Sequence, residues 1–192
     1  MIRTEENKQV VRRFLDGAFN DGDLSVVDQV VAEDVVIHLP PALEAQRGRE
    51  VVNRFVRELR TGFPDLRISI ELIFGERDRV VVRWVSTQMT HSGPYQGIPP
   101  TGRSARITAI DIFRVADGKV QEIWFNLDSL GPLQHMGLVP PEGLSTPGRI
   151  RFMLSSVGRL AALGMRDSLA KRRRGRTVES RAPEAAGRSE GG

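Results

Sequence analysis

The sequence contains no cysteine among its 192 residues and has only three histidines and one tyrosine. Without cysteine the chain can form no disulfide, and it offers neither a thiol nucleophile nor thiolate metal ligands. His38, His91 and His135 stand far apart, with no HxH or HxxxH spacing, so no metal site is expected. No apolar run approaches the ~20 residues that cross a bilayer, and the N-terminus lacks a signal-peptide pattern. We therefore expect a cytoplasmic protein without a bound metal.

The formal net charge of +4 is unevenly distributed along the chain. Residues 147–192 contain 11 Lys/Arg and 4 Asp/Glu, a balance of +7, out of totals of 28 and 24. The preceding residues therefore contain 17 basic and 20 acidic groups, a balance of −3. Because the basicity belongs to the tail, a high isoelectric point does not predict that the folded part binds nucleic acid.

The composition divides the chain into three parts. Residues 1–138 have the patterns of one folded domain, residues 139–148 are a linker rich in proline and glycine, and residues 149–192 form a basic tail. The spacing of apolar residues over 149–170 is typical of an amphipathic helix, and the composition beyond it is typical of disorder. Arginine on one face and Leu, Phe and Met on the other suit weak contact with a membrane surface through 149–176. A solvated extension is the alternative.

The spacing of hydrophobic residues changes from helical to strand-like along the domain. Helical spacing comes first, is interrupted by one short strand, and gives way to alternation after residue 64. The predicted helices are 5–19, 24–31 and 50–60, and the predicted strands are 35–38, 66–75, 79–91 and a hairpin within 103–128. This order predicts an α+β fold with helices on one face of a curved antiparallel sheet.

Asp111 is the main catalytic candidate. It lies in the middle of a predicted strand between Ile110 and Ile112. A carboxylate in an apolar pocket has a raised pKa, which suits a general base that removes a proton next to a carbonyl. Alternatively, Asp111 is solvated or paired with an arginine, such as Arg83 or Arg106.

The turn of the hairpin decides which residues share the face of Asp111. A two-residue turn at 117–118 would place Asp111 opposite Trp124. A three-residue loop with a glycine bulge would place it opposite Ile123 and beside Phe125. The second register is favoured, because the xDGK sequence suits a type I turn followed by a left-handed glycine, but both remain open.

His38 and His91 end predicted strands, where the rim of a pocket would lie, and each could move a proton near neutral pH. Asp128 is also explained as the N-cap of a closing helix, and the two tryptophans as core or interface residues. The remaining candidates for ligand contact are aromatic or polar residues on the same strands and on the proline-rich loop: Trp84, Tyr95, Trp124, Phe125, Asn126 and Asp128.

Five stretches together resemble the SnoaL-like polyketide cyclases and ester cyclases of the nuclear-transport-factor-two-like (NTF2-like) superfamily. They are FLDGAFNDGDLSVVDQVVAEDVVIH, FPDL, HSGPYQGIPPTGR, IDIFRVADGKVQEIW and LDSLGPLQHMG, and the resemblance covers residues 5–138. It implies a cone-shaped α+β barrel with a deep pocket at its wide end, often as a homodimer. The related cyclases close a ring by an intramolecular aldol reaction without metal or organic cofactor.

The resemblance also implies a catalytic pair, formed by a polar residue on the penultimate strand and an aspartate on the last strand. In this sequence the two positions fall at Asp111 and Phe125. Phenylalanine cannot relay a proton, so the aldol mechanism does not transfer intact. We expect a cofactor-free cyclase, isomerase or hydrolase acting on a small apolar, cyclic or polyketide-like molecule, with Asp111 as base and His38 or His91 assisting. The alternative is a small-molecule binding or sensing domain without catalysis.

Overall fold

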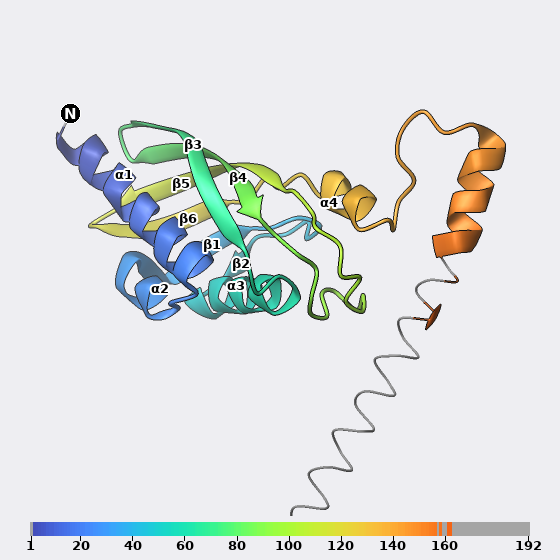
Figure 1. Ribbon diagram of the computed structural model, residues 1–192. Coiled ribbons are helices and arrows are strands. Elements are labelled where there is room, and N and C mark those ends of the chain that lie inside the picture. Colours follow the sequence, from blue (N-terminus) through green and yellow to red (C-terminus); the bar gives the residue numbers. More distant parts are fainter. Residues whose placement is uncertain (1, 157, 159–160, 163–192) are drawn as a thin grey trace, which may run out of the picture.

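The computed structural model describes residues 2–156, 158 and 161–162, and its elements follow the predicted order. Three α-helices and a π-helix come early in the chain, and most of the sheet follows them (Figure 1). The elements are α1 (Ile2–Phe14), η1 (Leu15–Asp21), α2 (Ser25–Val30), β1 (Val31–His38), β2 (Gln46–Arg47), α3 (Arg49–Gly62), β3 (Arg67–Glu76), β4 (Arg79–Gln88), β5 (Thr108–Ala116), β6 (Lys119–Trp124) and α4 (Leu130–His135).

The six strands form one sheet in the order β2-β1-β6-β5-β4-β3. All neighbouring pairs are antiparallel except β1 and β6, which run parallel. The α+β fold with helices on one face of the sheet is therefore confirmed, but the sheet is mixed rather than purely antiparallel. In Figure 1 α1, α2 and α3 lie against the same side of the sheet. We call this side the inner face and the other the outer face.

Alternating side chains on the strands separate the two faces. On β5 Asp111, Phe113 and Val115 are buried on the inner face, whereas Ile110 and Arg114 point to the outer face. This period of two follows from the pleat of a strand, in which successive side chains point to opposite sides. The inner face therefore contains one carboxylate in an otherwise apolar row.

The predicted helix 5–19 changes its winding at Leu15. Its first part is α-helical as α1, but η1 is a π-helix of seven residues. The apolar residues repeat every four positions, and this repeat drifts by about 40° per turn on an α-helix with 3.6 residues per turn. A wider turn with i→i+5 bonds absorbs the drift and keeps Leu15, Ala18 and Phe19 buried.

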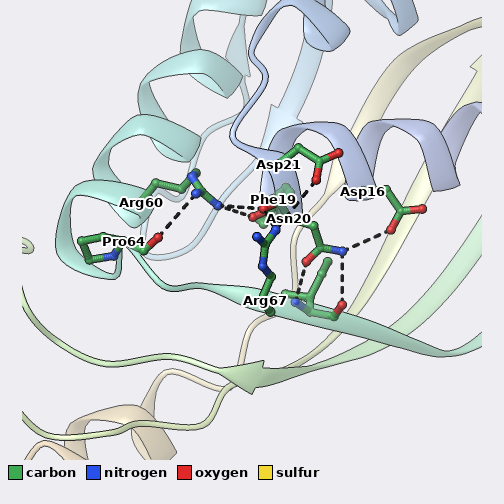
Figure 2. A network of polar contacts seen from close by, with 8 residues as sticks. Asp16, Phe19, Asn20, Asp21, Arg60, Pro64 and Arg67 are labelled. Atoms are coloured by element: carbon green, nitrogen blue, oxygen red, sulfur yellow. Dashed lines mark hydrogen bonds and ion pairs between the residues drawn. The ribbon is translucent and has the colours of Figure 1, made fainter.

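Polar side chains fasten the end of η1 to α3 and β3 (Figure 2). The Arg60 guanidinium donates to the carbonyl oxygen of Phe19 at 2.6 Å, and the Asn20 side chain accepts from the backbone N–H of Ile68 at 2.7 Å. The Arg67 guanidinium also bonds to the Asn20 carbonyl oxygen. These contacts satisfy carbonyl groups that the end of a helix leaves without partners. They hold Phe19 in place against the sheet.

Part of the basic tail is helical. Residues 146–156 form a helix that begins earlier than the predicted start at 149 and stands apart from the sheet in Figure 1. The predicted continuation to residue 170 lies mostly outside the described residues. In the part of the chain that the structure describes, no helix is long and apolar enough to cross a membrane.

Candidate functional site

The Asp111 side chain is completely buried on the inner face, with 0% of its surface exposed. The Trp84 indole N–H donates to Asp111 Oδ2 at 2.6 Å, and the backbone N–H of Asn126 donates to Oδ1 at 3.0 Å. Burial raises the pKa of Asp111 to about 6, although both hydrogen bonds act to lower it. Neither predicted arginine partner is used, since Arg83 lies on the outer face and pairs with Glu71. Asp111 is thus a desolvated carboxyl group held by two donors.

The hairpin register differs from both predicted alternatives. Asp117 and Gly118, with φ of 53° and 72°, form a two-residue turn, but one extra residue on β6 shifts the pairing between Arg114 and Val115. Ile112 pairs with Trp124, which brings Asp111 level with Phe125. The favoured three-residue loop is therefore wrong. The predicted placement of Phe125 on the face of Asp111 still holds. The favoured and the observed registers differ by two residues, and such a difference leaves each side chain on the same face.

Aromatic rings fill the space around this carboxyl group. The Phe125 ring lies 5.1 Å from Phe55 and 6.5 Å from Phe113, and Phe19 lies 5.9 Å from Trp84. We call this group the aromatic cluster: Phe14, Phe19, Phe55, Trp84, Phe113 and Phe125. Sequence reasoning identified Phe125 as a departure from the related cyclases, but missed that it packs within a cluster. That packing joins residues from five elements and leaves no local signal in the sequence.

A cavity of about 100 Å³ opens near the ends of β4 and α3, beside α4. We call it the mouth cavity. Its wall is mainly apolar, with four polar residues near α4 and the proline-rich loop. The lining residues are Leu59, Phe63, Met89, Tyr95, Gln96, Ile107, Leu127, Asp128, Ser129, Pro132, Leu133 and Met136. An apolar wall with a few polar groups is typical of a small-molecule site, although such sites usually enclose about 300–1,000 Å³.

The loop that carries Tyr95 is fixed to the end of α3. The Gly62 carbonyl oxygen accepts hydrogen bonds from the backbone N–H groups of Ser92 and Gly93, both at 3.0 Å. A Cβ atom at Gly93 would lie 1.9 Å from the carbonyl oxygen of Thr61, so only glycine fits. The Tyr95 ring packs 5.2 Å from Phe63, and burial raises the pKa of its hydroxyl. Tyr95 lines the mouth cavity, and its contact with a ligand stays a prediction.

His91 is buried close to the same cavity. Its ring lies 5.2 Å from Phe63, and burial lowers the pKa of the imidazole. The backbone N–H of Thr101 donates to Nδ1 at 3.3 Å, so Nδ1 is an acceptor and the neutral ring carries its proton on Nε2. Nε2 is buried without a hydrogen-bond partner in the structure. His91 thus offers one buried N–H donor behind the wall of the mouth cavity.

His38 lies on the outer face and does not meet Asp111. Its ring stacks on Trp124 with centroids 5.0 Å apart, and its Nε2 lies 2.9 Å from a Glu122 carboxylate oxygen. The guanidinium of Arg79 lies 5.3 Å from the centre of the Trp124 ring. The structure therefore separates His38 and Trp124 from Asp111 and His91.

The other candidates take structural positions. The Asp128 carboxylate accepts from the backbone N–H groups of Leu130 and Gly131 at the start of α4, as an N-terminal cap, and it also borders the mouth cavity. Trp84 is fully buried in the core. Asn126 is exposed and lines a groove of about 460 Å³ with Arg83. Among residues 2–156 no group of three or more His, Asp or Glu could hold a metal ion.

Asp111 itself lines none of four cavities that the described residues form. These are the mouth cavity, the groove beside Asn126, and two hollows of about 280 and 250 Å³ along α3. Ile107, just before β5, borders the mouth cavity, and Ala109 and then Asp111 follow it on the inner face of β5. On the segment that follows β6, Phe125 is level with Asp111, and Leu127, which pairs with Ala109, lines the cavity. The acid and the cavity are thus neighbours on one wall, with Ala109 between Asp111 and the residues that line the cavity.

Helices on one face of a mostly antiparallel sheet, a buried acid on its inner face and an apolar cavity at one end define an NTF2-like fold. The family model described as SnoaL-like polyketide cyclase matches residues 9–136, and the chain belongs to this family. Among curated proteins none matches the chain.

Solved structures agree with this assignment. IdmH from Streptomyces antibioticus, provisionally assigned as a polyketide cyclase, is 32% identical with a TM-score of 0.61, covering 68% of this chain and 98% of its own. A SnoaL-like protein from Jannaschia sp. CCS1, with the same provisional assignment, is 27% identical with a TM-score of 0.65, covering 72% and 95%. AclR from Streptomyces galilaeus, provisionally assigned as a hydroxylase, is 27% identical with a TM-score of 0.63, covering 71% and 99%.

Proposed function

We propose that the protein is a cofactor-independent acid–base enzyme of the polyketide-cyclase type, acting on a small apolar, cyclic or polyketide-like molecule. The observation that carries this proposal is the isolated carboxyl of Asp111, with no exposed surface and a pKa raised to about 6. Such a group is mostly ionised at neutral pH, yet it is far more basic than an ordinary aspartate. Buried acids of this kind are concentrated at functional sites.

In this proposal the substrate enters through the mouth cavity and reaches Asp111 when the Phe125 ring turns aside. The carboxylate removes a proton from the carbon next to a carbonyl, leaving an enolate that attacks a second carbonyl and closes a ring. The alkoxide formed on the second carbonyl takes the proton back from Asp111, which restores the carboxylate. The donors from Trp84 and Asn126 keep both carboxylate oxygens in place. The Nε2–H of His91 is a further donor for a substrate oxygen near the mouth.

Exchange of α-protons for deuterium tests this chemistry without knowledge of the natural substrate. Cyclic and polyketide-like ketones are incubated with the protein in D2O, and the loss of their α-proton NMR signals is followed. We expect the wild-type protein to accelerate exchange and Asp111→Asn to abolish this acceleration. Asp117→Asn, which changes an exposed acid in the turn between β5 and β6 and lies outside the cavity wall, serves as the matched control and should retain it.

A non-catalytic binding domain is the second candidate, and the aromatic cluster favours it. Phe125 occupies the position that the resemblance assigns to an acid, and it packs against Phe55 at 5.1 Å. A scaffold can keep its pocket while losing its chemistry. Ketones that bind, as seen by line broadening, but do not exchange with either protein would establish this function instead.

A further inference from the structure

The helix of residues 146–156 turns its apolar stripe away from the body of the protein. Ile150, Met153 and Leu154 are exposed by 56%, 57% and 72%. Ser156 is buried and donates a hydrogen bond to the carbonyl oxygen of Gly137 at 3.1 Å, and Phe152 is half-buried. The helix is thus attached to the end of α4 by its other side, which leaves the stripe to face outward.

Arginines border this stripe on both edges. With about 100° between successive residues of a helix, Arg149 and Arg151 lie on either side of Ile150, and both are exposed. The sequence over 149–176 contains nine basic residues and one acidic residue. Apolar side chains between cations are typical of a helix that lies in the plane of a lipid interface.

We propose that residues 146–156 bind the surface of an anionic lipid bilayer, with Ile150, Met153 and Leu154 entering the interface and the arginines contacting acidic headgroups. A second copy of the chain is a poorer partner for electrostatic reasons. A symmetric contact would bring the Arg149 and Arg151 side chains of two copies together, and like charges repel.

The attachment point gives this contact a consequence for the mouth cavity. Gly137, which accepts the bond from Ser156, directly follows Met136 in the wall of the cavity. A helix bound to a bilayer would therefore hold the mouth cavity close to the membrane surface. An apolar ligand could then pass from the lipid into the cavity. The lipid contact itself does not depend on Asp111 or on any catalytic activity.

Co-sedimentation of the full-length protein with vesicles tests the proposal. Vesicles of phosphatidylcholine with and without phosphatidylglycerol are compared as salt is raised. We expect binding to the anionic vesicles only, weakening with salt because the headgroup attraction is screened. Arg149→Gln with Arg151→Gln should weaken binding by about fivefold for each arginine removed.

A triple variant, Ile150→Ser with Met153→Ser and Leu154→Ser, keeps every charge and should reduce binding at least tenfold. Its matched control is Leu43→Ser, a fully exposed residue between β1 and β2, and this control should bind like the wild type. The proposal is overturned if the anionic vesicles do not bind the protein, or if the triple variant binds them unchanged. A triple variant that instead lowers the protein's mass in sedimentation equilibrium would assign the stripe to a protein interface and also overturn it.

Discussion

Replacing Asp111 with asparagine should change how the stability of the protein depends on pH. A pKa of about 6 in the folded chain, against 3.8 for an ordinary aspartate, corresponds to roughly 3 kcal/mol of unfolding free energy. Because the folded protein holds the proton more tightly, this stability is fully present below about pH 4 and is lost as pH rises through 6. Asparagine does not titrate, so the variant should lack this loss.

The measurement is urea unfolding of both proteins from pH 4 to pH 8, followed by circular dichroism. The free-energy difference, wild type minus variant, should fall by roughly 2.5 kcal/mol over this range, because a small part of the about 3 kcal/mol is already lost at pH 4. His91 has a lowered pKa and contributes the opposite slope, as do Asp65 and Glu122, but these groups are present in both proteins and cancel.

The unfolding free energies of the two proteins should also differ by an amount that is constant with pH, and this constant difference does not test the pKa of Asp111. Asparagine can accept only one of the hydrogen bonds from Trp84 and Asn126, which costs about 1–3 kcal/mol at every pH. If the Asp111→Asn curve runs parallel to the wild-type curve, the carboxyl is not desolvated and its role as a base is refuted.

Three further predictions concern Trp84, Gly93 and the outer face of the sheet. Trp84→Phe removes a donor that lowers the pKa of Asp111, so NMR titration should show that pKa moving above 6, and a move toward 3.8 would contradict the assignment. Gly93→Ala should destabilise the protein by at least about 2 kcal/mol in urea unfolding because its Cβ meets a backbone oxygen, whereas Gly158→Ala, with nothing near its Cβ, should not. The homodimer that the resemblance implies remains a prediction, and the exposed apolar residues of the outer face are its candidate contact. Phe74→Ser with Ile110→Ser should then yield monomers in sedimentation equilibrium. An unchanged mass would exclude that face.

The helices and the hairpin could be predicted because each has a local pattern. The apolar spacing of α3 and the alternation of β5 identify these elements without knowledge of their partners. The position of the turn at Asp117, although not its favoured length, and the cap at Asp128 likewise depend on residues close in sequence. The residues that determine each of these features lie close together in the sequence, so a single sequence contains the information.

The features that were missed depend on distant contacts. The parallel pairing of β1 with β6 joins Ile37 to Ile123, and the bond from Trp84 to Asp111 spans 27 residues. No residue of the turn sequence predicts the bulge on β6, because the same turn sequence also fits hairpins in other registers. Phe125 could be identified as unusual from the resemblance, but only packing shows which rings surround it.

The wide turn at Leu15–Asp21 makes the N-terminal region sensitive to chain length. The Asn20 side chain is fixed to β3. The orientation of each residue before it therefore depends on the number of helical residues that separate it from Asn20. Deleting one residue within this segment would rotate everything upstream by about 100°. Val11 and Phe14 would leave the core and polar neighbours would enter it, so single-residue deletions here should be tolerated far less than substitutions.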